Sequence, residues 1–241
     1  MLLLVSGEGP SDLGALRPLA RGYEFVPGPM TILLDRLAEV RLGYSLLDYD
    51  AIRFVAKAEL AEDTPKRPPR QLRAPGKQRP KESAYYAENA RRLACKAAAL
   101  AEAEGDLVLP VLFRDADGTQ SAGRGEWQAK WDSMLKGFRD GESALGVAML
   151  PQPKSEAWLL CACRQPAYQH CYQLEQESGN DRSPNPLKAQ LDALLDGASS
   201  AVQLADTVRS GRIDPQRIDM PSYNAFRARL EEVLGQVVPC S

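Results

Sequence analysis

The chain has 241 residues, of which 44% are hydrophobic and 26% are charged, and its formal net charge is −2. This is the composition of a globular protein with a sizeable core, and it excludes collagen-like, coiled-coil and disulfide-scaffold proteins. No apolar run approaches the roughly 18 residues of a membrane span, and Leu2–Val5 is too short for a signal sequence. The five cysteines are an odd number and favour a cytoplasmic protein with free thiols.

The apolar pattern predicts strands alternating with helices. Leu2–Val5 is expected to be a buried strand that runs into a Gly-rich loop, and Pro29–Gly43 has the apolar stripe of a helix. Ala51–Ala58 indicates a second strand. Ser83 is expected to cap an Ala-rich helix that Gly105 ends.

Strands and helices continue to alternate in the second half of the predicted domain. Leu107–Phe113 is almost wholly apolar, as expected of a strand covered on both faces. A helix follows between Trp127 and Gly141, then a strand over Ala144–Leu150, and then a helix that includes Glu156–Leu160. The sequence therefore predicts an α/β fold with a mainly parallel sheet flanked by helices over residues 1–163 and a helical C-terminal extension over 164–241.

A basic, Pro-rich insertion over residues 64–81 interrupts the predicted domain. Its composition favours neither helix nor strand. Such a segment is either a solvated insertion or an arm that binds the phosphate backbone of DNA or RNA. Its candidate nucleic-acid-binding residues are Lys66, Arg67, Arg70, Arg73, Lys77, Arg79 and Lys81.

Acidic residues follow two of the predicted strands. Glu8 comes after the first strand, and Asp115 and Asp117 come after the third. In open parallel sheets, ligands bind beyond the carboxyl ends of the strands. If the chain is extended there, Asp115 and Asp117 face the same side, roughly 6.6 Å apart. Three clustered carboxylates favour a bound Mg²⁺ or Mn²⁺ ion, although Asp115–Gly118 is also a typical turn sequence.

These motifs resemble the TOPRIM family, and among its members the small uncharacterised TOPRIM-like proteins and the nucleases of the overcoming-lysogenisation-defect type. The matching segments are Val5–Asp12, Asp115–Asp117 and Pro153–Leu160, with further likeness in Ser183–Lys188 and Met220–Phe226. The resemblance implies a TOPRIM-like fold and a Mg²⁺-dependent nuclease that cleaves phosphodiester bonds. It implies Glu8, Asp115, Asp117 and Lys154 as catalytic residues and Glu8, Asp12, Asp115, Asp117 and Glu156 as metal ligands.

The resemblance also implies a biological setting. Small proteins of this kind look like effectors in phage-defence or toxin systems, sometimes beside a partner ATPase. The present sequence has no Walker A pattern, so any ATP-driven step is expected to come from a second subunit. Nucleic acid is the expected substrate, and no membrane partner is expected.

Two other functions remain open from the residues alone. Asp115–Thr119 also resembles the first motif of haloacid-dehalogenase-type phosphatases, in which Asp115 would be the nucleophile and Asp117 the acid/base. A non-catalytic nucleic-acid- or metal-binding module is the other alternative. Its candidate zinc ligands are Cys161, Cys163, His170 and Cys171. The spacing of these residues is poor for one tetrahedral site and favours buried thiols instead.

Overall fold

The computed structural model describes residues 1–62, 81–116 and 124–237. Its centre is a four-stranded sheet in the order β4-β1-β5-β6, and every neighbouring pair of strands is parallel. The strands are β1 (Leu2–Gly7), β4 (Ile52–Ala56), β5 (Val108–Phe113) and β6 (Val147–Met149). The predicted α/β class with a parallel sheet flanked by helices is confirmed.

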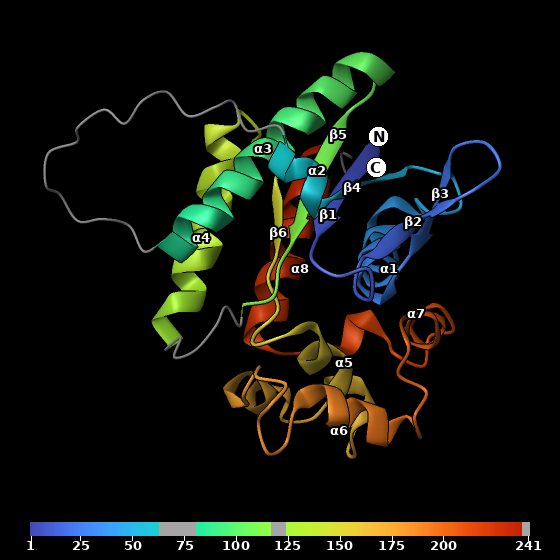
Figure 1. Cartoon of the computed structure of the whole chain (residues 1–241), viewed down its shortest axis with the longest axis vertical. Coiled ribbons are helices and arrows are strands. Elements are labelled where there is room, and N and C mark those ends of the chain that lie inside the picture. The colour runs from blue at the N-terminus through green and yellow to red at the C-terminus, as the bar shows by residue number, and fades with distance from the viewer. Residues whose placement is uncertain (63–80, 117–123, 238–241) are drawn as a thin grey trace, which may run out of the picture.

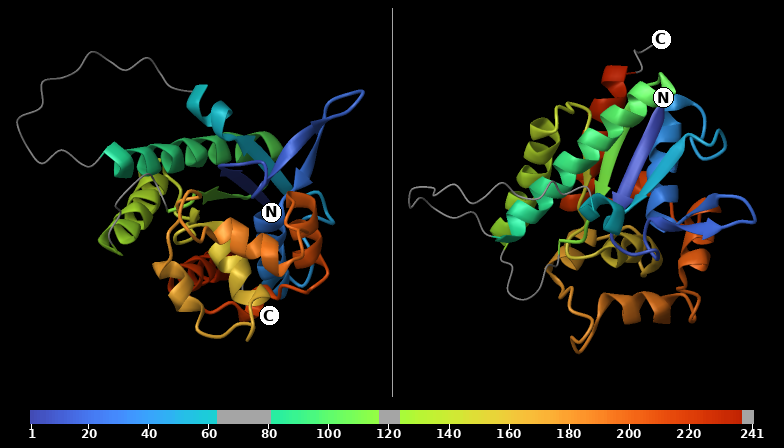
Figure 2. Two further views of the ribbon diagram at one scale, coloured as in Figure 1. Left: turned by 60° about the horizontal axis from the view of Figure 1, so that its bottom comes forward. Right: turned by 45° about the horizontal axis from the view of Figure 1, so that its top comes forward.

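Helices cover both faces of the sheet (Figures 1 and 2). One face carries α3 (Lys81–Glu104) and α4 (Arg124–Asp140), which pack against each other. The opposite face carries α1 (Pro29–Leu42) and α8 (Pro221–Val237). Because both faces are covered, every residue of β1 and β5 is buried, which explains their continuous apolar sequences.

The C-terminal part of the chain is helical after α5 (Ser155–Cys163). Its described elements are η1 (Cys171–Gln176), α6 (Leu187–Leu194), α7 (Ala201–Arg209), η2 (Pro215–Arg217) and α8. Trp158 of α5 packs against Tyr223 and Phe226 of α8, with ring centroids 5.0 and 5.6 Å apart. These residues belong to the same hydrophobic core as the sheet. The last described strand, β6, ends at Met149, and the boundary predicted at residue 163 coincides with the end of α5.

Several predicted bounds differ from the structure. The strand expected over Ala51–Ala58 ends at Ala56, because Lys57 begins the short helix α2 (Lys57–Glu62). Ser83 lies inside α3 and does not cap it, since that helix already begins at Lys81. The end of α1 is as expected: Gly43 has a φ of 79°, and its N–H donates to the Glu39 carbonyl at 2.7 Å.

One hairpin has no counterpart in the predicted elements. It consists of the antiparallel strands β2 (Gly14–Pro18) and β3 (Tyr23–Pro27). A loop was expected after β1, and the chain enters β2 at Gly14. A Cβ on Gly14 would lie 2.1 Å from the Val26 carbonyl oxygen, so only glycine fits where the two strands approach.

Candidate functional site

The carboxyl ends of the four parallel strands lie at one edge of the sheet, facing α5 and α6 (Figure 1). The segments that leave these ends bring together residues that are far apart in the sequence. Glu8 and Asp12 follow β1, Lys57 follows β4, Arg114 and Asp115 follow β5, and Ser155 and Glu156 follow β6. Side chains from all four strand ends are therefore available to one site.

The backbone around Asp115 is held by contacts with three elements. The Arg114 N–H donates to the Met149 carbonyl, and the Ala116 N–H donates to the Pro151 carbonyl at 3.0 Å. The Tyr86 hydroxyl donates to the Asp115 carbonyl at 2.8 Å. The buried Lys130 ammonium donates to the Ala116 carbonyl at 2.6 Å. Asp115 therefore has a fixed position at the end of β5.

Three carboxylates contact Ser155, the first residue of α5. Its backbone N–H donates to Oδ1 of Asp115 at 3.0 Å, and its hydroxyl donates to Oδ1 of Asp12 at 2.5 Å. The same hydroxyl lies 3.4 Å from Oε2 of Glu156. Asp12, Asp115, Ser155 and Glu156 are called the Ser155 cluster below. Three of the predicted metal ligands thus meet at one serine.

Two carboxyl groups of the Ser155 cluster have raised pKa values. Burial raises the pKa of Asp12, although hydrogen bonds from Ser155 and Ser11 oppose the shift. Burial also raises the pKa of Glu156, and the negative charge of Asp12 adds to that shift. Ionising either carboxyl group where it lies is therefore costly. A bound cation lowers this cost by stabilising the negative charge.

Glu8 belongs to a different set of contacts. Its Oε1 atom accepts a hydrogen bond from the Tyr85 hydroxyl at 3.3 Å. The same oxygen lies 3.3 Å from Nζ of Lys57 and 3.4 Å from Nε of Arg114. Glu8, Lys57, Tyr85 and Arg114 are called the Glu8 cluster below. Its single carboxylate faces two cations, so its chemistry differs from that of the Ser155 cluster.

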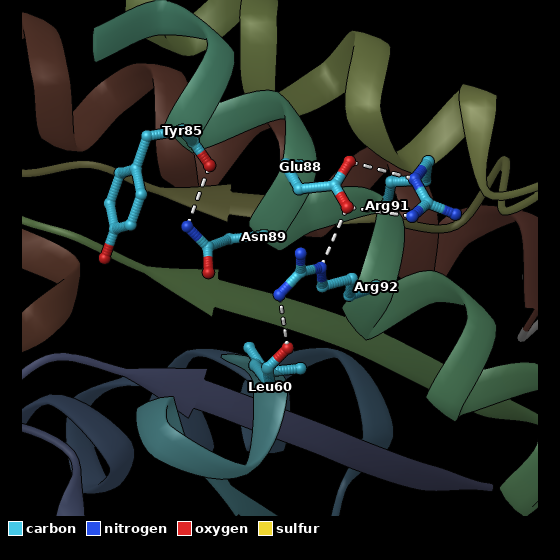
Figure 3. A network of polar contacts seen from close by, with 6 residues as sticks. All are labelled: Leu60, Tyr85, Glu88, Asn89, Arg91 and Arg92. Atoms are coloured by element: carbon cyan, nitrogen blue, oxygen red, sulfur yellow. Dashed lines mark hydrogen bonds and ion pairs between the residues drawn. The ribbon is translucent and has the colours of Figure 1, made fainter. Parts of the chain in front are cut away.

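The two helices that carry Lys57 and Tyr85 are joined by Arg92. Figure 3 shows Arg92 on α3, where Nε donates to Glu88 at 2.8 Å and Nη1 donates to the Leu60 carbonyl of α2 at 2.8 Å. Asn89 donates to the Tyr85 carbonyl at 2.8 Å in the same view. These contacts fix α2 against α3 and so hold Lys57 near Tyr85.

The environment of Lys57 favours its charged form. Burial by itself lowers the pKa of this ammonium group. The hydrogen bond with Tyr85 and the negative charge of Glu8 outweigh burial, so the pKa of Lys57 is raised.

The expected trio of Glu8, Asp115 and Asp117 is only partly described. Asp117 lies outside the described residues, and Glu8 contacts cations and a phenol. Within the described ranges, no three or more His, Cys, Asp and Glu side chains are gathered closely enough to hold a metal ion. A metal centre at this edge of the sheet therefore stays a prediction.

Lys154 lies at the N-terminus of α5, as expected, and is held by a residue of the C-terminal part. Its Nζ donates to Oδ1 of Asp181 at 2.8 Å, and the Lys154 side chain is largely buried. The charges of Lys154 and Asp181 both act on the pKa of Glu156, in opposite directions. Asp181 is therefore a neighbour of the Ser155 cluster.

The basic segment lies almost entirely outside the described residues. Lys66, Arg67, Arg70, Arg73, Lys77 and Arg79 lie outside the described residues. Lys81 is the first residue of α3, and its side chain is also outside the described part. Nucleic-acid binding by these seven residues stays a prediction.

The expectation of free thiols is wrong for Cys161 and Cys171, which form a disulfide with a Cα–Cα distance of 5.1 Å. The bond links the buried end of α5 to the start of η1. Two of the four candidate zinc ligands are therefore not available as thiolates. Cys163 has a free thiol, and burial raises its pKa.

Sequence reasoning missed Ser155, Lys57, Tyr85 and Arg114 as members of these clusters. A usable signal existed for two of them, because Lys57 and Arg114 directly follow β4 and β5, the neighbours of β1 in the sheet. The role of Ser155 depends on contacts with residues 40 and 143 positions away and has no local signal. Tyr85 is one of two adjacent tyrosines on α3, and the local sequence does not distinguish them.

A cavity of about 700 Å³ lies elsewhere, between the β2–β3 hairpin, α1 and the segment before β4. Its lining includes Phe25, Asp35, Glu39, Asp50 and Arg209. It contains no residue of either cluster. The buried Asp35 already accepts hydrogen bonds from Ser45 and Leu46, so its carboxylate has a structural role.

Comparison of the chain with models of known protein families, with curated proteins and with solved structures gives no match. No described helix has both the length and the apolar character needed to cross a membrane.

Proposed function

We propose that this protein is a Mg²⁺- or Mn²⁺-dependent nuclease of TOPRIM-like fold that cleaves phosphodiester bonds of DNA or RNA. One observation carries the proposal: carboxylates of Asp12, Asp115 and Glu156, which follow three different parallel strands, all contact Ser155 at the carboxyl edge of the sheet. This edge is where ligands bind in open α/β sheets. Packing gives no reason to collect three acidic groups there, whereas phosphoryl chemistry does.

The donor chemistry of the Ser155 cluster fits a hard divalent cation. All its charged groups are carboxylates, which are the ligands that Mg²⁺ and Mn²⁺ prefer. Asp12, Asp115 and Glu156 would hold the ion together with Asp117, which lies outside the described residues, since the described carboxylates are not gathered closely enough to hold it by themselves. A bound ion would supply an activated water and positive charge for the phosphate.

The remaining roles belong to the residues of the chain. The Ser155 N–H holds Asp115 in place, and the Ser155 hydroxyl holds Asp12. Lys154, fixed by Asp181, adds positive charge beside the cluster and helps to stabilise a negatively charged transition state. The basic segment over residues 64–81 is proposed to bind the nucleic-acid backbone. A role as a phage-defence or toxin effector beside an ATPase rests on the family resemblance alone.

The test is cleavage of a panel of single- and double-stranded DNA and RNA with Mg²⁺ or Mn²⁺. We expect the natural protein to cleave at least one substrate and Asp115→Asn to lose at least about 100-fold in rate. Asp132→Asn is the matched control, because Asp132 is exposed on α4 and accepts a hydrogen bond from Gln128 of the same helix. Cleavage that survives in Asp115→Asn, or no cleavage of any substrate by the natural protein, contradicts the proposal.

A phosphatase is the second candidate, favoured by the contact between Lys154 and Asp181. This contact brings a later acidic residue to the site of Asp115, which would act as nucleophile with Asp117 as acid/base. Hydrolysis of p-nitrophenyl phosphate with a phosphate group trapped on Asp115 would favour the phosphatase. Cleavage of nucleic acid without such an adduct would favour the nuclease.

A further inference from the structure

Arg114 is a buried cation with unused hydrogen-bond donors. Its side chain is 0% exposed. One of its amino groups, Nη1, donates to the Phe113 carbonyl at 2.8 Å, but Nε and Nη2 have no hydrogen-bond partner among the described residues. Buried polar groups are nearly always hydrogen-bonded, and an unsatisfied buried charge is costly. The unpaired donors of Arg114 therefore indicate a ligand that the side chain is built to receive.

The two unpaired groups lie on one edge of the guanidinium. The Nε–H bond and one N–H bond of Nη2 point in nearly parallel directions, and this edge binds two oxygens of a carboxylate or phosphate at once. Glu8 presents Oε1 to this edge at 3.4 Å from Nε, in an ion pair that does not have the geometry of a hydrogen bond.

The other contacts to Glu8 are equally long. Lys57 Nζ and the Tyr85 hydroxyl each lie 3.3 Å from Oε1. Charge-assisted hydrogen bonds are usually about 2.7–2.9 Å long. Three donor groups thus surround Oε1 of Glu8 at distances longer than those of typical charge-assisted hydrogen bonds. The space between these donors therefore suits an anion with more oxygens than Glu8 presents.

Charge and exposure favour an exchangeable occupant. Arg114 and Lys57 supply two positive charges against one negative charge on Glu8, and both cations lie within 6 Å of the Tyr85 ring centroid. The Glu8 side chain is 41% exposed, and it lies between Gly7 and Gly9. Its carboxylate is therefore the part of the cluster that is able to rotate into solvent.

We propose that Arg114, Lys57 and Tyr85 form a phosphate-binding pocket and that the Glu8 carboxylate occupies it until a phosphate displaces it. The pocket adjoins Asp115, the residue after Arg114. If the proposed nuclease function is correct, the pocket takes a phosphate of the nucleic-acid chain next to the bond that is cleaved. Glu8 then acts as an internal anion, whereas the sequence predicted it to be a metal ligand.

The test is titration calorimetry with inorganic phosphate at low ionic strength in EDTA, so that no metal contributes. Glu8→Gln removes the internal anion and is expected to bind phosphate at least about tenfold more tightly than the natural protein. Glu102→Gln, on the exposed surface of α3, makes the same change in net charge and is expected to leave the affinity within about twofold.

Further substitutions in the Glu8→Gln background identify the pocket. Arg114→Lys keeps the charge but loses the paired donors, and is expected to weaken phosphate binding at least about tenfold. Because Arg114 is buried, Lys57→Met, at a half-exposed side chain, provides a second measurement that does not depend on folding of the Arg114 variant. Phosphate binding that is no tighter in Glu8→Gln than in Glu102→Gln, or that is unaffected by Lys57→Met, overturns the proposal.

Oligonucleotides with and without a 5′-phosphate, also in EDTA, distinguish the sources of phosphate. Tighter binding of both by Glu8→Gln, lost with Lys57→Met, supports a backbone phosphate, and an effect confined to the 5′-phosphorylated strand supports a terminal one. If neither Glu8→Gln nor Lys57→Met changes the affinity for oligonucleotides, the link to nucleic acid is overturned and the pocket is assigned to free phosphate. If the protein binds phosphate but cleaves no substrate, the proposed nuclease function is refuted, whereas the proposed phosphate-binding pocket is supported.

Discussion

The Ser155 hydroxyl lies 2.5 Å from Oδ1 of Asp12, although 143 residues separate them in the chain. The contact connects the start of α5 to the loop after β1, across the carboxyl edge of the sheet. It gives the half-buried Asp12 carboxylate a hydroxyl donor in addition to that of Ser11. Ser155 is thus the residue on which the geometry of the candidate site depends.

Ser155→Ala is expected to lower the free energy of unfolding by about 1 kcal/mol, because it removes a hydrogen-bond donor from the half-buried Asp12 carboxylate. Urea denaturation of the metal-free protein measures this change. Ser133→Ala is the matched control, since the Ser133 hydroxyl donates to the Ala129 carbonyl of its own helix. A loss no larger than that of the control would show that Asp12 does not depend on Ser155.

The disulfide between Cys161 and Cys171 is expected to stabilise the fold. It closes a short loop, with a sequence separation of 10, and a bond of this kind contributes about 3 kcal/mol. Addition of a reductant should therefore lower the midpoint of urea unfolding, and the variant with both cysteines changed to serine should be insensitive to it. Thiol titration under denaturing conditions should give two fewer thiols before reduction than after, and equal titres would contradict the bond.

Glu175 predicts a dependence of stability on pH. Its Oε1 accepts the Ser222 N–H at 2.7 Å at the start of α8, yet burial raises its pKa. The folded state therefore holds this proton more tightly than the unfolded state, and ionisation of Glu175 costs stability as the pH rises from its unfolded pKa of about 4.3 through its folded pKa.

Glu175→Gln keeps an acceptor for Ser222 and removes the charge. Relative to the natural protein, we expect the free energy of unfolding of this variant to increase, and the variant therefore to become more stable, as the pH rises from 4 to 7 in urea denaturation experiments. Exposed Glu102→Gln is the control and is expected to show no such trend. A free energy of unfolding of Glu175→Gln that falls relative to that of the natural protein as the pH rises would show that the ionised carboxylate is stabilising.

The basic segment predicts salt-dependent binding of nucleic acid. Changing its seven Lys and Arg residues to glutamine should weaken binding and flatten the plot of log K against log salt, because fewer counterions are released. Fluorescence anisotropy with a labelled oligonucleotide measures both quantities. An unchanged slope would remove this segment from the interface.

The regular elements were predictable where burial dictates the sequence. The wholly apolar Leu107–Phe113 indicates a strand covered on both faces, and Gly43 marks the end of α1 through its positive φ. The β2–β3 hairpin was missed because it lies apart from the main sheet and exposes much of its surface, so its side chains show little apolar alternation. Hydrophobic periodicity cannot reveal such a hairpin.

The candidate site was predictable in location but not in its contacts. Parallel strands place Glu8 and Asp115 at one edge of the sheet, which the sequence order alone implies. The separation of the acids into two clusters depends on Ser155 and Arg114, whose side chains meet partners far along the chain. Such contacts are decided by tertiary packing, which local sequence patterns do not encode.

Binding of Mn²⁺ followed by electron paramagnetic resonance tests the central claim most directly. We expect the natural protein to bind the ion and the variants Asp115→Asn and Glu156→Gln to lose at least about tenfold in affinity, with Asp132→Asn unchanged. All proteins should keep the same circular dichroism spectrum. Equal Mn²⁺ affinity in all four proteins, or no binding by the natural protein, would contradict a metal centre at the Ser155 cluster.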